Sequence, residues 1–335
     1  MTDATQASTP APAPAPTPEA DELRAALVRV RTEVGKAVVG QDGAVTGLLI
    51  ALLAQGHVLL EGVPGVAKTL LIRSLSRALQ LDTKRVQFTP DLMPGDITGS
   101  VVYDPGTGRL QFREGPVFTN ILLADEINRT PPKTQSALLE AMEERQVSAE
   151  GETRPLPTPF LVAATQNPIE YEGTYVLPEA QLDRFLMKLV LDLPARDAEV
   201  EVLARHAGGF DPRDLAAAGV EPVLDAATLA RAQRAVGTVT VSPDVLAYVV
   251  DLARGTRQSP SVRLGVSPRG ATALLAASRA WAWLSGSTGV TPDHVQTMAI
   301  PVLQHRIQLR PEAELEGVGA DAVLRSIVQQ VRVPI

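Results

Sequence analysis

The sequence predicts an α/β fold, in which a parallel sheet lies between helices and a second, mainly helical unit follows. Three observations support this prediction. An apolar run at 57–60 is followed by a Gly- and Pro-rich loop and then by apolar residues at helical spacing. Two further apolar runs, at 121–124 and 160–165, have the composition of strands that are buried on both faces. After Pro194 the composition becomes Ala-rich and helical, which predicts a domain boundary near this residue.

The composition excludes several classes of protein. The chain has 335 residues, enough for two or three compact units, and its net charge of −7 argues against a nucleic-acid-binding surface. It contains no cysteine, which excludes disulfides, zinc–thiolate sites and thiol nucleophiles. No apolar run approaches the roughly 20 residues that span a bilayer, and residues 1–20 do not have the pattern of a signal peptide. We expect a soluble, cytoplasmic protein.

The chain begins with a segment that cannot form a core. Residues 1–20 are rich in Thr, Ala and Pro, a composition that favours extended polyproline geometry, and we expect a disordered tail. Apolar residues at helical spacing then predict one helix over 23–35 and a second over 45–53, both before the first strand.

The loop after the first strand has the composition of a phosphate-binding loop. It follows the pattern G-x-x-x-x-G-K-[ST] at all but one position and consists of Gly62, Val63, Pro64, Gly65, Val66, Ala67, Lys68 and Thr69. Glycines let backbone N–H groups converge on phosphate oxygens, and the helix that follows adds the positive end of its dipole. Lys68 would reach the β- and γ-phosphates, and Thr69 would ligate Mg²⁺. Ala67 stands where Gly is expected, and Ala tolerates fewer backbone angles.

The predicted ligands are therefore ATP and Mg²⁺, bound by residues 62–69 together with Leu70. The two helices that precede the first strand are unusual for a minimal nucleotide-binding fold. We expect them to cover the base of the nucleotide.

Two hairpins are predicted within the core. A strand at 84–88 leads into a Pro- and Gly-containing loop at 89–99. Strand-forming residues on both sides of a Gly-containing turn predict one hairpin near 101–112 and another near 147–158. The first interrupts the regular alternation of strands and helices. Both are candidates for moving or gripping a partner, with surface decoration as the alternative.

Two strands end in residues suited to catalysis. Because ligands bind at the carboxyl ends of parallel strands, Asp125 and Glu126 face the place where the loop would hold phosphates. Asp125 would support Mg²⁺, directly or through water, and Glu126 would polarise an attacking water. Asn167 follows the next apolar run and could orient that water, although an Asx-type turn before Pro168 is an alternative.

The second unit uses one helix-start signal three times. A Ser or Thr followed by Pro is typical of an N-cap with Pro in the first turn, and it occurs at 242–243, 267–268 and 291–292. The middle helix carries Arg269 in its first turn, where a cation is unfavourable by up to about 1 kcal/mol. An anion should therefore lie nearby. It is either the γ-phosphate across the domain cleft or a carboxylate in a surface ion pair.

Taken together, the motifs resemble those of the MoxR-type AAA+ ATPases over roughly residues 24–335. The segments that carry the resemblance are GVPGVAKT at 62–69, FREGPVF at 112–118, LADEINR at 123–129, QSALLEAM at 135–142, ATQNP at 164–168, LPEAQLDRF at 177–185 and GVSPR at 265–269. The resemblance implies an αβα core at 21–195 with a five-stranded parallel sheet of order 5-1-4-3-2. It also implies a small all-α lid domain at 196–335.

The resemblance further implies roles for single residues. Asn167 corresponds to the sensor 1 residue, Arg184 to an arginine finger that acts on the ATP of a neighbouring subunit, and Arg269 to sensor 2. The segment that ends in Gln41 resembles the base-binding segment. Val176 stands where the family usually has Pro, which we expect to alter loop rigidity slightly and nothing catalytic.

The function implied is Mg-dependent ATP hydrolysis in a ring of identical subunits, usually a hexamer, with chaperone-like remodelling of partners. Those partners often contain von Willebrand factor A domains, and no nucleic acid is expected. Three alternatives stay open. A nucleotide-dependent scaffold with little turnover is disfavoured by Glu126, Asn167 and Arg184, and a DNA-remodelling or helicase ATPase by the net charge. The third alternative is a small-molecule kinase, which would not explain an arginine at position 184 that acts on a neighbouring subunit.

Overall fold

The computed structural model describes residues 18–106, 108–149, 151–167 and 173–334. The first helix, α1 (Pro18–Gly35), begins before the predicted end of the tail, so residues 18–20 belong to the helix. Pro is favourable in the first turn of a helix, and the acidic residues Glu19 and Asp21 interact favourably with the dipole there. The rest of the predicted tail lies outside the described residues.

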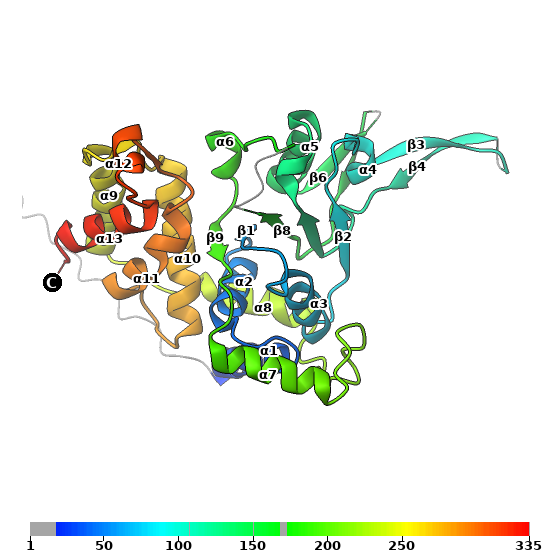
Figure 1. Cartoon of the computed structure of the whole chain (residues 1–335), viewed down its shortest axis with the longest axis horizontal. Helices are drawn as coiled ribbons and strands as arrows, with labels where there is room; N and C mark the ends of the chain where they lie inside the picture. The colour runs from blue at the N-terminus through cyan, green and yellow to red at the C-terminus, as the bar shows by residue number, and fades with distance from the viewer. Residues whose placement is uncertain (1–17, 107, 150, 168–172, 335) are drawn as a thin grey trace, which may run out of the picture.

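A five-stranded parallel sheet forms the centre of the molecule (Figure 1). Its spatial order is β2-β5-β8-β1-β9. The strands are β1 (Val58–Glu61), β2 (Thr83–Gln87), β5 (Ile121–Asp125), β8 (Leu161–Gln166) and β9 (Met187–Val190). When these strands alone are numbered along the chain, the order is 5-1-4-3-2, which confirms the predicted topology.

Alternate residues of the central strands point to opposite faces of the sheet and build two cores. Val58 and Leu60 pack in one core with α1, α2 (Asp42–Leu53) and α3 (Lys68–Ala78). Leu59, between them, packs in the other core with α5 (Pro132–Glu144). The strands are buried on both faces because helices cover both, which is why their sequences are continuous apolar runs.

Both predicted hairpins are present. The first pairs β3 (Gly99–Asp104) with β4 (Arg109–Glu114) and extends away from the core at the right of Figure 1. The second pairs β6 (Gln146–Ala149) with β7 (Glu152–Pro155). The segment predicted as a loop before the first hairpin contains a short helix, α4 (Pro94–Thr98). Its start is fixed by Asp96, whose Oδ2 accepts a hydrogen bond from the Met93 N–H at 2.8 Å.

The lid lies at the left of Figure 1. Its helices are α9 (Pro243–Gln258), α10 (Pro268–Leu284), α11 (Pro292–Leu303), α12 (Pro311–Leu315) and α13 (Ala320–Gln330). The caps predicted at Ser242 and Ser267 are present, since each hydroxyl accepts a hydrogen bond from a backbone N–H of the first turn. The lid is not purely helical: β10 (Val262–Leu264) pairs with β11 (Gln308–Leu309). Strands this short show no period-two pattern in the sequence.

The helices α7 (Arg196–Ala207) and α8 (Ala226–Val236) follow β9, and short α6 (Glu179–Leu182) precedes it. We assigned α7 and α8 to the lid on composition, and the boundary after residue 195 stays a prediction. Both helices contact the helices that precede the first strand, α7 at the end of α1 and α8 at the end of α2. Arg205 of α7 donates to the Gly35 carbonyl oxygen at 3.0 Å, and Gln233 of α8 donates to that of Leu52 at 2.7 Å.

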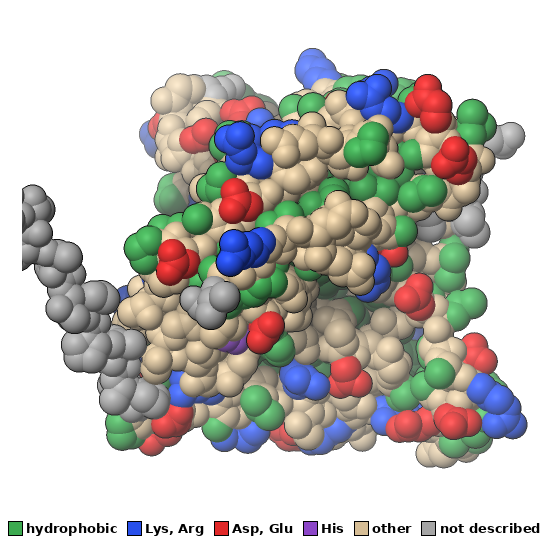
Figure 2. All heavy atoms as spheres, turned by 90° about the vertical axis from the view of Figure 1, so that its left-hand side faces the viewer, with side chains coloured by type: hydrophobic (Ala, Val, Ile, Leu, Met, Phe, Trp, Pro, Cys, Tyr) green, Lys and Arg blue, Asp and Glu red, His purple; other side chains and the backbone are tan. Residues whose placement is uncertain are grey.

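Among the described helices, none has both the length and the apolar character needed to cross a bilayer. On the face of the molecule seen in Figure 2, cationic and anionic side chains are interspersed rather than gathered into one basic patch.

Candidate active site

The phosphate-binding loop connects β1 to α3 and has a conformation that its sequence only partly favours. Gly65 has a φ of +90°, which glycine adopts freely. Ala67 also lies in the left-handed region, with a φ of 62°, at a cost of roughly 1–2 kcal/mol for a residue with a Cβ. Gly62 is required for a different reason, because a Cβ there would lie 2.6 Å from the Leu191 carbonyl oxygen.

The loop opens into a cavity of about 380 Å³, here called the phosphate cavity. It is lined by Pro64, Gly65, Ala67, Lys68, Thr69, Leu70, Asp125, Glu126 and Asn167. Three segments that are far apart in the sequence therefore meet at the carboxyl edge of the sheet, as predicted from the strand ends. Pro168 lies outside the described residues, so the Asx-turn interpretation of Asn167 stays open.

Lys68 begins α3 and bends back toward the sheet. Its Nζ donates to the Gly62 carbonyl oxygen and, at 3.5 Å, lies near that of Gln166 at the end of β8. The amine thus lies between the loop and a strand end. At either position, a phosphate oxygen could replace the backbone carbonyl oxygen as the acceptor for the Lys68 amine.

The two carboxylates at the end of β5 are held by neighbouring side chains. Asp125 Oδ1 accepts from Thr165 Oγ1 at 2.6 Å, and Asp125 Oδ2 pairs with Arg85 Nη2 at 2.7 Å. The Glu126 N–H donates to the same Thr165 hydroxyl at 2.8 Å, and Glu126 Oε2 pairs with Arg129 Nε at 3.0 Å. Glu126 has a φ of 57°, so a second strained residue lies in the cavity.

The donor set fits Mg²⁺ bound together with a nucleotide. Thr69 and Asp125 supply a hydroxyl and a carboxylate oxygen to one cavity, and hard oxygen donors are what Mg²⁺ prefers. The described residues contain no group of three or more His, Cys, Asp or Glu that could hold a metal ion by themselves. Mg²⁺ usually takes only one or two protein ligands and completes its shell with phosphates and water.

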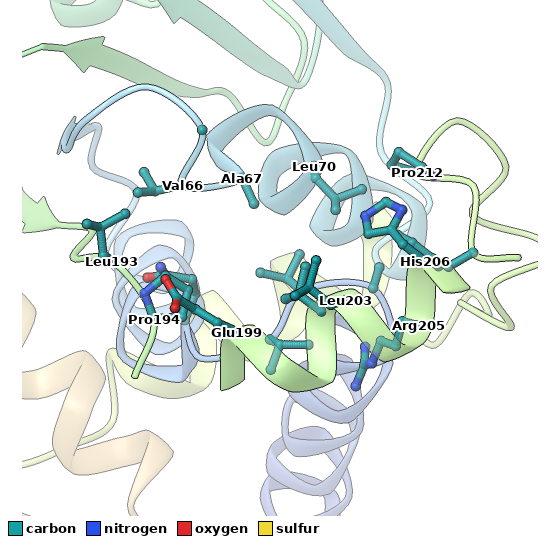
Figure 3. Close-up of a pocket in the computed structure, with 17 residues that line it drawn as sticks. Val66, Ala67, Leu70, Leu193, Pro194, Glu199, Leu203, Arg205, His206 and Pro212 are labelled. Atoms are coloured by element: carbon teal, nitrogen blue, oxygen red, sulfur yellow. The ribbon is translucent and has the colours of Figure 1, made fainter. Parts of the chain in front are cut away.

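A second cavity, of about 490 Å³, adjoins the phosphate cavity and is here called the base cavity. The two share Gly65, Ala67 and Leu70 as a common wall. Figure 3 shows Ala67 and Leu70 on one side, and Leu203 and His206 of α7 on the other. Leu203 is 69% exposed, so an apolar surface faces the space where a base would lie. The contribution of α7 was not predicted.

The segment between α1 and α2 also lines the base cavity, through Val38, Val39 and Gln41, and its predicted role in binding the base stays a prediction. The Gln41 side chain is nearly buried and donates from Nε2 to the Asp192 carbonyl oxygen at 3.0 Å. This bond joins the segment to the chain that leaves β9. Gln41 thus shapes the wall of the cavity.

A third cavity, of about 370 Å³, contains both candidate arginines and is here called the arginine cavity. It has no lining residue in common with the phosphate cavity. Arg184 Nε pairs with Glu143 Oε2 at 2.9 Å, and Arg269 Nη1 pairs with Glu143 Oε1 at 3.1 Å. We offered the γ-phosphate and a nearby carboxylate as alternative partners for Arg269. In this structure the partner is a carboxylate.

Some of these residues were missed from the sequence. Thr165 and Arg85 approach Asp125 from β8 and β2, and their positions in the sheet could have been inferred from the strand register. No sequence pattern predicted a role for Glu143, because it is one of several glutamates on the exposed face of α5 and its partners come from two distant segments.

Comparison with known proteins identifies the family. Residues 57–187 match the model of the ATPase family associated with various cellular activities (AAA), and residues 254–327 match the AAA lid domain. The chaperone MoxR1 of Mycobacterium tuberculosis is 42% identical over 317 residues, which cover 92% of this chain and 82% of that protein. The chain belongs to the MoxR-type AAA+ ATPases.

Two further comparisons cover nearly the whole chain. The uncharacterised protein YeaC of Bacillus subtilis is 47% identical to this MoxR-type protein over 315 residues, which cover 94% of this chain and 97% of YeaC. The crystal structure of a candidate ATPase from Cytophaga hutchinsonii superposes with a TM-score of 0.87 at 38% identity, and the match covers 95% and 97% of the two chains. The family is one of ATPases with a chaperone-like role.

Proposed function

We propose that this MoxR-type protein hydrolyses ATP, with Mg²⁺, at the interfaces between subunits of a ring, and that the cycle remodels partner proteins. The separation of the phosphate cavity from the arginine cavity carries this proposal. Arg184 and Arg269 lie outside their own subunit's phosphate cavity, so a neighbour's nucleotide is the natural anion for them. Repetition of one such head-to-tail contact closes a ring, and a hexamer is the size expected from the family.

Within one subunit, the residues have separate tasks. The backbone of 62–67 and Lys68 bind phosphate oxygens, while the base cavity and Gln41 receive the base. Thr69 and Asp125 hold Mg²⁺, which neutralises charge on the phosphates when bound. Glu126 accepts a proton from the attacking water.

Two further contacts complete the site. Asn167 orients the attacking water, and Arg129 fixes the Glu126 carboxylate until water and nucleotide are in place. Arg184 of the next subunit then stabilises the charge that develops on the γ-phosphate. An arginine finger of this kind is worth roughly 10³–10⁵ in rate.

The partner is a protein rather than a nucleic acid. MoxR1, the relative described above, is named a chaperone. The β3–β4 hairpin presents Tyr103 and Leu110, which lie opposite each other and are 64% and 68% exposed. Exposed apolar pairs of this kind suit contact with a protein chain. Clients with von Willebrand factor A domains are the class that the family resemblance favours.

The first test is the substitution Glu126→Gln. It removes the group that accepts the proton but leaves the phosphate cavity intact, so ATP binding should persist while turnover falls by about 10²-fold or more. A phosphate-release assay and nucleotide titration, with Glu140→Gln on the exposed face of α5 as control, would measure both. Unchanged turnover would remove Glu126 from the mechanism. Slow turnover in the unchanged protein, not raised by any partner, would favour the scaffold alternative.

The subunit interface is tested by mixing. Arg184→Ala and Lys68→Ala subunits should each be inactive alone. A mixed ring should recover activity, because an intact phosphate cavity then meets an intact arginine. If Arg184→Ala alone hydrolyses ATP as fast as the unchanged protein, the interface mechanism is wrong.

A further inference from the structure

We propose that Glu143 is a positioning residue that holds Arg184 and Arg269 as one unit, so that both approach the γ-phosphate of a neighbouring subunit together. The proposal rests on the proposed function, because it assumes that these arginines act across a subunit interface. Nothing in the sequence motifs assigns a role to Glu143. Its position at the C-terminal end of α5 becomes informative only through its two partners.

The Glu143 carboxylate is divided between two cations. Each oxygen of Glu143 pairs with a different arginine, Oε2 with Arg184 at 2.9 Å and Oε1 with Arg269 at 3.1 Å. Two guanidinium groups this close repel each other unless an anion lies between them. Arg269 also lies in the first turn of α10, where the helix dipole disfavours a cation. The one carboxylate offsets both effects.

The cluster of Glu143, Arg184 and Arg269 remains accessible to solvent. The side chains of Arg184, Arg269 and Glu143 are 29%, 47% and 36% exposed. A guanidinium has five N–H donors, so an arginine that pairs with one carboxylate oxygen retains capacity for a phosphate oxygen. An anion from outside can therefore join the cluster without displacing Glu143.

The segment that carries Arg184 makes a second set of contacts with the lid. Asp183, directly before Arg184, accepts from the Ser267 hydroxyl at 2.9 Å and from Arg306 Nε at 2.7 Å. The Arg306 side chain is only 2% exposed, and it also donates to the Leu186 carbonyl oxygen at 3.0 Å. Burial lowers the pKa of Arg306, and the ion pair with Asp183 opposes that shift. Residues 183 and 184 thus both connect to the start of α10.

The charges around the cavity indicate what it receives. Its lining carries Arg145, Arg184, Arg269 and Arg306 against Glu143 and Asp183, an excess of positive charge. A cluster of guanidinium groups at a half-exposed cavity suits a phosphate. The occupant that completes the cluster is the terminal phosphate of a nucleotide bound to a second copy of this chain.

The test compares Glu143→Gln with Glu144→Gln, which makes the same charge change on the adjacent exposed residue of α5. Glu143→Gln keeps the size of the side chain but loses the charge that holds two cations. We expect kcat to fall about 10- to 100-fold, because a small misplacement of a catalytic group costs that much. KM for ATP should change little, and Glu143→Asp should recover part of the loss. Glu144→Gln should match the unchanged protein.

Mixing experiments separate positioning from a local structural effect. Glu143→Gln subunits mixed with Lys68→Ala subunits should regain turnover, because intact arginine units then meet intact phosphate cavities. Glu143→Gln mixed with Arg184→Ala should not, since every interface then lacks an intact arginine unit. The assembly state of each variant with ATP, measured by sedimentation, should equal that of the unchanged protein.

The outcomes distinguish this inference from the proposed function. If Arg184→Ala has normal turnover, the interface mechanism itself fails. If Arg184→Ala is impaired but Glu143→Gln behaves like Glu144→Gln, only the positioning role of Glu143 fails. Absence of recovery in the mixture with Lys68→Ala would overturn action across the interface for Glu143. Loss of assembly in Glu143→Gln alone would assign the residue to ring formation instead and overturn the positioning role.

Discussion

The phosphate cavity and the arginine cavity are built by different means. The phosphate cavity uses a short run of consecutive residues around Lys68, whose backbone N–H groups would bind phosphate under the proposed function, together with two strand ends. The arginine cavity is assembled from the segment between α2 and β1, the end of α5, the segment after α6, α10 and the segment after α11. The first depends on the path of one loop, and the second on charged side chains whose elements must all be in place.

This difference predicts different sensitivities. A site made from backbone groups should tolerate loss of a side chain without loss of the fold. A site that includes buried charges should lose stability when one partner is removed or when the pH changes. The expected effects on stability decrease from Arg306 to His57 to Ala67.

The largest effect on stability is expected from Arg306→Met. This change leaves Asp183 without its buried partner, and breaking a buried ion pair in this way costs about 3–5 kcal/mol. The matched change in the phosphate cavity is Lys68→Met, which should abolish ATP binding but leave the thermal unfolding midpoint nearly unchanged. Equal effects of the two substitutions on the unfolding midpoint would contradict the contrast between the cavities.

Acid should destabilise the fold through His57, which lines the arginine cavity. His57 is buried, with Nε2 donating to the Met142 carbonyl oxygen at 3.0 Å and Nδ1 accepting from the Val162 N–H at 3.0 Å. Burial lowers its pKa to about 4. In the unfolded chain the pKa is near 6.5. The unfolded state therefore binds more protons between these values.

The contribution of neutral, buried His57 to the free energy of unfolding should thus be fully present above pH 6.5 and be lost as the pH falls toward 4. The loss should reach about 2 kcal/mol at pH 5. Urea unfolding at pH 7 and pH 5 would measure it. The variant His57→Gln should show a weaker dependence on pH, with some remaining because burial also lowers the pKa of His305. An unchanged slope in His57→Gln would count against this account.

The smallest effect is expected from Ala67→Gly. Glycine relieves the cost of the left-handed conformation but loses more entropy on folding, so the protein should gain at most about 1 kcal/mol. Ala247→Gly, at an exposed position inside α9, should instead cost about 1 kcal/mol. The two changes should therefore shift the melting temperature in opposite directions. A loss at Ala67 equal to that at Ala247 would show that the loop is not strained there.

The same difference explains what the sequence could predict. Gly65, Lys68 and Asp125 belong to motifs with fixed local spacing, so their meeting followed from the fold class. The strand order came from the family resemblance. By contrast, the pairing of Glu143 with Arg184 and Arg269 depends on how the lid packs on the core, which no local pattern encodes. Short elements such as α4 and β10 were missed because their patterns are shorter than a helical or strand period.

The contacts between the lid and residues 183–188 also protect one edge of the sheet. At one edge, β2 presents exposed polar residues, including Lys84 and Arg85, which discourage pairing with another strand. At the other edge, β9 has β1 as its one strand neighbour among the described residues, α11 packs against it, and Gln304 donates to the Lys188 carbonyl oxygen at 2.9 Å. The lid therefore occupies the place that a sixth strand would take. A core separated from it would expose a largely apolar edge and tend to aggregate.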